Sequence, residues 1–577
     1  MESKNLILAI TLSIGILLIW SILFEAPPIE DPSINNQATE IKKEDGNKDA
    51  DLDFNSFDIG ETIVNSSEDI LSVDESLKNS QRIKIKTPSL SGSINLLGLK
   101  IDDLVLEKYN KTLEADSEKI RFLSPGDTRD GLEISFGWIK PKDSSFDVPD
   151  SKSLWSISNS STTLDENNEV ILEWSNNSGQ IFQTFISVDK DYLFNVKQVV
   201  KNNSSEEIII NNNSKVIRKK APQLSGMFIL HEGPIGVLKE ELELIDYDDL
   251  KEDKDVLNYE SDNGWIGITD KYWLAALIPD QNIPFKSIYA YDDNLGYVAY
   301  FRSLDSYSVK PNTKVEIDSK VFAGAKEADL LDLYQEKYNI YNFDLAIDWG
   351  WFYFITKPLF YAISYFYQLF GNFGIAIIIL TVITRIVFFP LANWSFVSMA
   401  KMKLLQPEMT RIKDLYKDDR QQQQQALMAL YKKEKVNPVS GCLPILIQIP
   451  FFFAIYKMLF ISIEMRHAPF YGWIEDLSVK DPTTIFNLFG LIPWDPPSFM
   501  IIGIWPILMG LTMYLQQKLN PAPPDPIQAK IFSFFPLFIT ILLSQFAAGL
   551  VIYWTTNNIL SILQQWIITR RTKIKTN

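Results

Sequence analysis

Long apolar runs separated by charged segments dominate the pattern of this 577-residue chain. Each run approaches the ~20 residues that a bilayer-spanning helix needs. The five runs are Leu6 to Phe24, Gly371 to Ala392, Leu443 to Ile463, Phe499 to Leu515 and Ile531 to Thr569. The last run is about twice the length of one span, and Ala547-Ala548-Gly549 within it is typical of a turn. The pattern therefore predicts six transmembrane helices.

The first run has the position of a signal peptide but not its form. Its apolar stretch of 19 residues is longer than the core of a cleaved signal, and no small-x-small cleavage site follows Ser21. An uncleaved signal anchor is the favoured interpretation, and a cleaved signal peptide is the alternative.

The positive charges predict an orientation. The loop from Asn393 to Cys442 carries nine Lys or Arg, the tail from Arg570 carries four, and the loop from Glu464 to Ser498 carries two. By the positive-inside rule the first loop and the tail are cytoplasmic. Both termini are then cytoplasmic, and the chain between the first two spans is exported.

The exported segment has two parts. From Glu25 to Ser80 there are 15 Asp or Glu against 4 Lys, which predicts a disordered acidic linker. From about residue 81 to 340 the pattern predicts strands: residues 192–200 alternate, and the runs 170–174 and 181–186 flank Ser-Asn-Asn-Ser-Gly. We expect a large antiparallel β-sandwich there.

Candidate chemistry in the exported part is sparse. It contains no nucleophile motif, zinc motif or glycine-rich phosphate loop. The one cysteine, Cys442, excludes an intramolecular disulfide, and His231 and His467 lie too far apart for a metal-ligand pattern. We expect no enzyme and no cofactor or metal. A carboxylate pair hidden among the scattered acids, as in a membrane-anchored carbohydrate-active enzyme, is the alternative.

Two further segments have amphipathic patterns. The aromatic-rich segment Trp349 to Tyr367 predicts a helix on the outer membrane surface, with a buried core helix as the alternative. In the cytoplasmic loop, helical periodicity predicts a two-helix hairpin in which Pro407 kinks the first helix or ends its first turn. The methionines of this hairpin are candidate contacts for apolar clients, and packing against one another is the alternative.

A single arginine, Arg385, interrupts the run from Gly371 to Ala392. A cation at mid-helix costs roughly 2.5 to 3.5 kcal/mol on translocon scales, so it needs a partner or water. The runs 443–463, 499–515 and 531–569 contain no Asp or Glu. Their neutral polar residues are Gln448, Ser544, Gln545, Thr555, Thr556, Asn557, Asn558, Gln564 and Gln565.

Three interpretations of Arg385 stay open. Its side chain could snorkel to the cytoplasmic end of the run, about 10 Å away. It could instead face a wet polar cavity, or pair with an acid outside the spans. In a cavity the cation would attract acidic residues of an entering segment, and Thr381, four residues earlier, would share its face.

Several motifs resemble, in the same order, the YidC family of membrane protein insertases. They are Asn437 to Tyr456, Met399 to Pro407, Met428 to Lys432, Arg466 to Phe470 and Asp525 to Gln528. Lys86 to Ile101 resembles the opening strands of the large periplasmic domain of Gram-negative members. One departure is Ala547-Ala548, where the family often has Pro-Ser, which puts the local turn geometry in doubt.

The resemblance implies a fold and a domain order. The fold is a polytopic α-helical membrane protein of six transmembrane helices with a five-helix insertase core, plus a large all-β periplasmic super-sandwich. The expected order is: signal anchor 1–24, acidic linker 25–80, periplasmic β-sandwich 81–345, interfacial helix 346–370, second span 371–392, cytoplasmic hairpin 393–442, third span 443–463, periplasmic loop 464–498, fourth span 499–517, cytoplasmic loop 518–530, fifth span 531–547, sixth span 548–569 and basic tail 570–577.

The resemblance also implies a mechanism. Hydrophilic tails of client proteins enter a polar groove open to the cytoplasm and the lipid, and apolar segments slide along spans three and five into the bilayer. Arg385 and Thr381 match groove positions, Phe452 a substrate-facing phenylalanine and Trp554 an aromatic position in the last span. With Gln448 and Tyr553 these are the candidate substrate-binding residues. Met402, Met409 and Met428 are candidate client or ribosome contacts on the hairpin.

The implied partners are nascent membrane proteins, the Sec translocon, the ribosome, signal recognition components and the lipid bilayer, with no specific nucleic-acid site. The implied location is the bacterial inner membrane. The short tail disfavours ribosome binding through a long basic extension. A small-solute transporter with an intramembrane cation is the alternative function; it predicts two related halves, and the sequence shows no such repeat.

Overall fold

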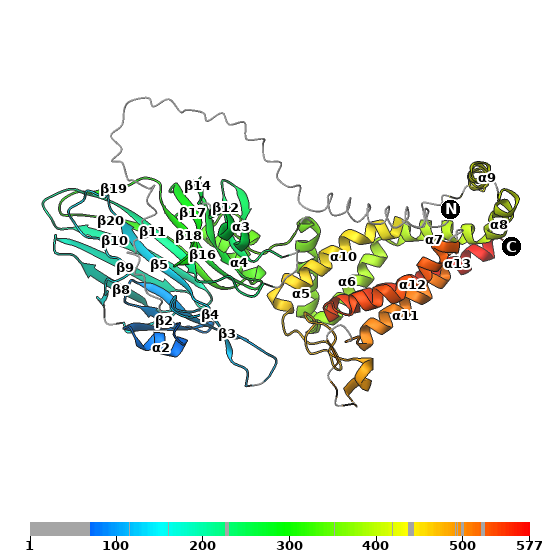
Figure 1. Cartoon of the computed structure of the whole chain (residues 1–577), viewed down its shortest axis with the longest axis horizontal. Coiled ribbons are helices and arrows are strands. Elements are labelled where there is room, and N and C mark those ends of the chain that lie inside the picture. Colours follow the sequence, from blue (N-terminus) through cyan, green and yellow to red (C-terminus); the bar gives the residue numbers. More distant parts are fainter. Residues whose placement is uncertain are drawn as a thin grey trace, which may run out of the picture. The chain divides into compact units, whose positions relative to one another are not determined.

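The computed structural model describes residues 70–576 except 115, 160, 225–229, 255, 351, 418, 435, 437–442, 491, 493, 495, 498–500 and 521–525 (Figure 1). The predicted signal anchor, the linker up to residue 69 and part of the motif that begins at Asn437 lie outside the described residues.

Two large β-sheets form the first half of the described chain. The first sheet runs in the order β14 (Leu257–Ser261), β17 (Phe285–Asp292), β18 (Gly296–Ser303), β11 (Ile208–Arg218), β5 (Leu132–Ile139), β3 (Lys100–Asn110), β2 (Leu90–Asn95), β1 (Arg82–Lys86) and β7 (Thr163–Leu164). In addition, β19 (Tyr307–Val309) pairs with β11, and β4 (Lys119–Leu123) pairs with β3. Its pairs are antiparallel except β1 with β7.

The second sheet runs in the order β13 (Glu241–Leu244), β12 (Gly233–Leu238), β15 (Gly264–Thr269), β16 (Trp273–Ile278), β20 (Thr313–Ala325), β10 (Leu193–Asn202), β9 (Gln180–Val188), β8 (Glu169–Ser175) and β6 (Ser156–Ile157). The predicted hairpin is present as β8 and β9, which pair antiparallel from Glu169 with Ser187 to Ser175 with Ile181.

The sheets enclose a shared apolar core. The rings of Trp138 on β5 and Phe182 on β9 have centroids 6.0 Å apart, and the Gln198 side chain of β10 donates to the Gly137 carbonyl of β5 at 3.1 Å. Alternating side chains point into this core, as expected for strands with one buried face. The predicted antiparallel β-sandwich is confirmed.

Helices make up most of the second half of the described chain. Short helices accompany the sheets: α2 (Val73–Lys78), α3 (Tyr247–Asp253), α4 (Ala328–Tyr338) and the 3-10 turn η1 (Phe343–Ala346). The helical part contains α5 (Tyr353–Phe370), α6 (Phe373–Val387), α7 (Phe389–Leu404), α8 (Gln406–Leu415), α9 (Arg420–Lys433), α10 (Leu443–Ile461), η3 (Ile463–Met465), η4 (Ile485–Gly490), α11 (Ile504–Leu519), α12 (Pro526–Leu543) and α13 (Ala548–Thr576).

The helices of the structure meet the length and apolar criteria of a membrane span less well than the apolar runs of the sequence do. Within the described residues, no single helix combines the length and apolar character of a span, and one pair, α6 with α7, does so only jointly across a bend of 67°. The count of six spans therefore stays a prediction.

The break between α6 and α7 was not predicted, since the apolar run continues to Ala392. The helix ends at Val387, and α7 starts after Phe388 with Pro390 in its first turn. Proline has no N–H to donate to the carbonyl four residues earlier, and its ring collides with that carbonyl. Helix α6 is therefore shorter than the run that predicted it.

Pro407 has the same effect in the predicted two-helix hairpin. It lies in the first turn of α8, and α7 ends just before it at Leu404. The predicted ending of a helical turn at Pro407 is confirmed, but the helix predicted through Met402 and Met409 is two helices. Met402 therefore belongs to α7 and Met409 to α8.

Helix α5 has one buried side and one exposed side. Its buried residues are Thr356, Leu359, Phe360 and Ile363. Its exposed residues include Tyr353, Phe354, Tyr365, Leu369 and Phe370. It is not the fully buried core helix of the alternative interpretation, and exposed aromatic residues suit the headgroup region of a membrane.

The turn between α12 and α13 is held by a distant loop. The amide of Ala548 donates to the Val479 carbonyl at 2.7 Å, and the amide of Gly549 donates to the Leu477 carbonyl at 3.0 Å. These bonds satisfy N–H groups that a helix start leaves without partners. The Ala547-Ala548 sequence is thus compatible with a tightly fixed turn.

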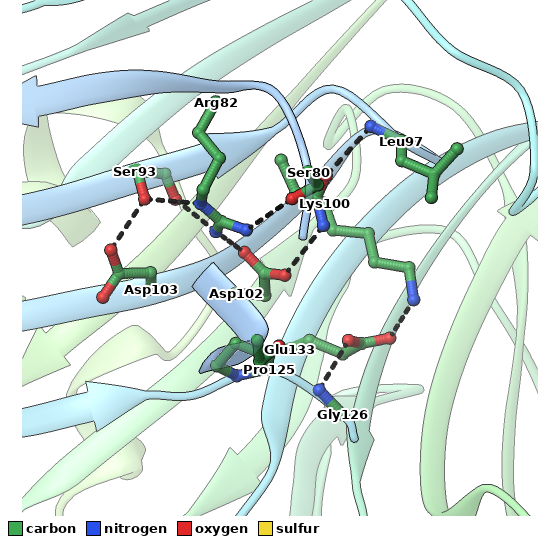
Figure 2. Close-up of polar contacts among 12 residues, drawn as sticks. Ser80, Arg82, Ser93, Leu97, Lys100, Asp102, Asp103, Pro125, Gly126 and Glu133 are labelled. Carbon is green, nitrogen blue, oxygen red and sulfur yellow. Dashed lines mark hydrogen bonds and ion pairs between the residues drawn. The ribbon is translucent and has the colours of Figure 1, made fainter. Parts of the chain in front are cut away.

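Figure 2 shows a buried network of ion pairs in the first sheet. Arg82 pairs with Asp102 and donates to Ser93 at 2.7 Å, and Ser93 in turn donates to Asp103 at 2.7 Å. The register of β2 with β3 shifts here, because Ser93 faces Asp103 whereas Ile94 faces Ile101. Asp102 is the extra residue of this β-bulge.

The same network limits what these carboxylates can do. Asp103 pairs with Arg121, and Glu133 pairs with Lys100 at 2.8 Å and accepts from the Gly126 amide at 3.1 Å. Each buried carboxylate thus has a cationic partner, as buried charges require. The adjacent acids Asp102 and Asp103 are consequently a structural element rather than a pair poised for acid-base catalysis.

Asp102 should give the folded protein a measurable pH dependence. Burial raises its pKa to about 6, although Arg82 opposes this. The folded state therefore binds this proton more tightly than the unfolded state, and stability is lost as pH rises from about 4 to about 6. Relative to Asp102→Asn, the wild-type free energy of unfolding should fall on the order of 2 kcal/mol across this window.

Unfolding of the full chain in detergent micelles, followed at several pH values, measures this difference. Glu118→Gln is the control, because the pKa of the exposed Glu118 is lowered by Lys111 and its contribution has the opposite slope. Parallel curves for wild type and Asp102→Asn would contradict the prediction.

Candidate functional site

The Arg385 side chain reaches from α6 to two other helices. Its Nε donates to the Asn557 side-chain oxygen on α13 at 2.7 Å, and one terminal nitrogen donates to the Gln448 side-chain oxygen on α10 at 3.2 Å. The same nitrogen donates to the Asn557 carbonyl at 3.3 Å. The guanidinium is thus held where α6, α10 and α13 meet.

All of these partners are neutral. In the described part of the chain Arg385 forms no ion pair, and its Nη1 has no hydrogen-bond partner. Amide dipoles satisfy N–H groups but do not cancel a full charge. Pairing with a described acid is therefore excluded, and the side chain lies across the bundle rather than along its own helix as snorkelling requires.

Helix α13 supplies a polar stripe to this site. Tyr553 is buried on this helix, Ser561 donates to the Asn557 carbonyl at 2.7 Å, and Gln564 donates to the Arg385 carbonyl at 3.3 Å. Tyr553, Asn557, Ser561 and Gln564 follow the spacing of one helix face. Asn557, Ser561 and Gln564 are absent from the predicted site residues, although this spacing could have identified them.

The neutral polar residues of the predicted spans do not share one site. Asn558 donates to Thr512 on α11 at 3.2 Å, and Gln565 donates to Asn520 at 2.9 Å. Gln545 reaches the Ile501 carbonyl at 3.4 Å. These side chains join α13 and its preceding turn to the α11 side, so only part of the set faces Arg385.

The predicted aromatic residues form a wall next to the polar stripe. The rings of Phe452 on α10 and Trp554 on α13 have centroids 4.8 Å apart at 69°, and the Phe452 ring lies 6.3 Å from that of Tyr456. Phe452 and Trp554 are partly buried, whereas Tyr553 is buried. The structure thus brings Phe452 and Trp554 together beside the residues that hold Arg385.

Thr381 is placed differently. It is buried, and its hydroxyl donates to the Ile377 carbonyl of its own helix at 2.7 Å. It shares the Arg385 face by its i,i+4 spacing, but its hydroxyl hydrogen is already used.

The three hairpin methionines lie in three environments. Met402 is partly buried on α7, Met409 is buried on α8 and touches the Tyr431 hydroxyl of α9 at 3.9 Å, and Met428 on α9 is 48% exposed. Self-packing therefore describes Met409, while Met428 presents its side chain outward.

Comparisons with known proteins cover both halves of the chain. Residues 82–362 match the family described as YidC periplasmic domain, and residues 365–576 match that described as 60Kd inner membrane protein. The membrane protein insertase YidC of Pelagibacter ubique (strain HTCC1062) is 48% identical over 576 residues, which cover 100% of both chains. This chain belongs to the YidC family of membrane protein insertases.

A second curated relative supports this assignment. The membrane protein insertase YidC of Sinorhizobium medicae (strain WSM419) is 44% identical over 578 residues, covering 100% of this chain and 96% of that protein. A solved structure described as an active YidC insertase with its first transmembrane domain resolved has 17% identity and a TM-score of 0.35, covering 84% of this chain and 92% of that chain.

Family membership confirms the resemblance predicted from the motifs. Members are named as membrane protein insertases, not as enzymes, so the carbohydrate-active alternative is set aside. The match to an inner membrane protein family supports a bacterial inner membrane location.

Proposed function

We propose that this chain inserts nascent membrane proteins by receiving their hydrophilic tails in a polar groove centred on Arg385. The observation that carries the proposal is a guanidinium held by neutral oxygens of Gln448 and Asn557 and paired with no described carboxylate. The neutral oxygens fix the orientation of the guanidinium, and its positive charge stays available to an incoming carboxylate.

The magnitudes favour brief binding. A carboxylate about 4 Å from a cation gains ~4 kcal/mol at an effective dielectric constant of about 20. Placing an aspartate at the centre of a membrane helix costs roughly 2.5 to 3.5 kcal/mol. Because the two terms nearly cancel, an acidic client tail would enter the groove and leave it again.

Apolar client segments need a different surface. Phe452 and Trp554 offer an aromatic wall next to the polar stripe. Helix α12 packs on α11 and exposes large apolar side chains on several sides. Among them are Ile531, Phe532, Phe534, Leu537 and Phe538. A client helix leaving the groove would pass along this surface into lipid.

The remaining parts of the proposal concern topology and partners. Six spans with both termini in the cytoplasm place the hairpin of α8 and α9 inside and the β-sandwich outside. The domain order expected from the sequence is kept, with α6 shortened. The insertase would also act as a membrane chaperone and with the Sec translocon, and the ribosome and signal recognition components would meet it at the cytoplasmic hairpin and tail.

Charge at residue 385 should matter most for acidic clients. We expect Arg385→Gln, which keeps much of the side-chain length, to reduce insertion of a client with an Asp-containing exported tail at least about tenfold, because a tenfold effect needs only ~1.4 kcal/mol of the attraction estimated above at ~4 kcal/mol. The same client with Asn in place of Asp should be affected little. Purified proteoliposomes and a protease-protection assay measure both.

Arg385→Lys is the matched control, because it keeps the charge and should retain most insertion of the acidic client. Normal insertion of acidic clients by Arg385→Gln would remove the charge-attraction role and leave the family assignment intact.

Phe452 should contact the client during synthesis. A photocrosslinking amino acid at position 452 is expected to capture a small membrane protein stalled during translation. The control position is Ile559, which is 51% exposed on α13 and lies on the side away from the polar stripe. Equal crosslinking from positions 452 and 559 would mean that clients contact the lipid-facing surface in general and that Phe452 does not line a groove.

Substitutions of the hairpin methionines should have different effects, because Met428 is exposed and Met409 is buried. Met428→Gln is expected to lower client crosslinking to the hairpin severalfold without changing thermal stability, because the residue is exposed. Met409→Gln should instead loosen the contact of α8 with α9 and raise protease sensitivity there. If Met428→Gln inserts all clients at the wild-type level, outward presentation of this residue has no role in client binding.

A further inference from the structure

An unusually apolar loop precedes α11. Residues 482–494 contain no charged side chain. Within this stretch the exposed large apolar residues are Ile485, Phe486, Leu488, Phe489, Ile492 and Trp494, of which Phe489 is 53% exposed. We call the described residues of this stretch, 485–490, 492 and 494, the apolar loop. In Figure 1 its η4 segment, drawn in orange, stands beside the start of α11.

Two residues just before the apolar loop fix it to α11. The carboxylate of Asp481, 1% exposed, accepts from the Trp505 amide at 3.0 Å, and the Thr483 hydroxyl oxygen accepts from the Ile504 amide at 3.0 Å. These are N–H groups of the first helical turn, where a negative charge is favourable. Gly503 permits the close approach, since an added Cβ would lie 2.3 Å from the Asp481 carboxyl carbon. The residues that lead into the loop are therefore joined to the start of α11.

The backbone of the loop is largely satisfied from within. The amide of Phe489 donates to the Thr484 carbonyl at 2.9 Å, and the amide of Ile492 donates to the Asn487 carbonyl at 3.0 Å. The amide of Trp494 donates to the Ile492 carbonyl at 2.8 Å. A loop without charges and with internally bonded amides can enter a region poor in water at low cost.

The backbone of the loop is strained at two of its large apolar residues. Leu488 and Phe489 both have positive φ values, 50° and 59°. Bulky residues with a Cβ disfavour this left-handed region, and such strain persists only where the surroundings enforce it. The fold thus holds two large apolar side chains outward instead of packing them inside.

We propose that the apolar loop inserts into the leaflet of the inner membrane in which α11 begins, the periplasmic leaflet under the expected orientation. Lipid is the occupant that the surface fits. Leu508 and Leu511 on α11, the helix that follows the loop, are exposed apolar residues as well, and the uncharged loop offers no ionic group to select a protein partner. Trp473, bonded to Asp481 at 3.1 Å, and Trp494 are partly exposed, and tryptophan prefers the bilayer interface.

The apolar loop would therefore fix the depth of α11 in the bilayer. Because Asp481 and Thr483 join the loop to the first turn of α11, lipid contact of the loop sets how far this helix enters the bilayer. The inference does not depend on the Arg385 groove, and it requires only that α11 enters the membrane.

The test uses the full chain in proteoliposomes with its only native cysteine removed by Cys442→Ser. Phe489→Cys carries an environment-sensitive fluorophore, and Glu475→Cys, at an exposed acidic position of the same connection, carries it as the control. Ile492→Cys is a second loop probe, in case Phe489→Cys disturbs folding. Lipids brominated near the headgroup or deep in the chains, and aqueous iodide, serve as quenchers.

We expect the probes at 489 and 492 to be quenched most by lipids brominated near the headgroup, and at least threefold less by iodide than the probe at 475. Iodide quenching equal to that at 475 would overturn the proposal, because the loop would then lie in water. Shielding of both loop probes from iodide and from brominated lipid would overturn it as well, because the loop would then be covered by protein.

Discussion

A positive charge inside an apolar helix bundle is the constraint on which the helical part depends. Arg385 is tolerated because α10 and α13 bring amide oxygens within hydrogen-bond distance of it. Three helices from distant parts of the sequence must therefore keep their relative positions for the charge to stay solvated. The polar stripe of α13 and the aromatic contact of Phe452 with Trp554 lie beside this charge.

The β-sandwich treats several of its buried charges differently. Arg82 pairs with Asp102 and Lys100 pairs with Glu133, whereas the buried Lys326 donates to the neutral Thr269 hydroxyl at 2.8 Å. The helical part keeps a charge whose described partners are all neutral.

The sequence predicted what depends on local periodicity. The strands β8, β9 and β10 follow from alternation, and the two-helix hairpin follows from spacing of three and four. The bend at Phe388 was readable from Pro390 but was masked by the unbroken apolar run. The partners of Arg385 could be named only as a class of neutral residues, because the choice of Gln448 and Asn557 over Asn558 depends on how α10, α11 and α13 pack. The bulge at Asp102 likewise depends on strand register, which alternation alone does not determine.

Two backbone hydrogen bonds fix the start of α13 to a distant loop. Leu477 and Val479 clamp its first two residues, while 29 residues extend from that clamp. At 1.5 Å per residue the C-terminal end of α13 lies ~40 Å from Ala548. A tilt of about 5° at Ala548 would therefore move that end by roughly 4 Å. Asn557, nine residues from the clamp, would move by only about 1 Å. Contacts beyond Gln564 oppose such a tilt, because Gln565 donates to Asn520 at 2.9 Å and the buried Ile568 packs in a cluster with Ala392 and Phe396.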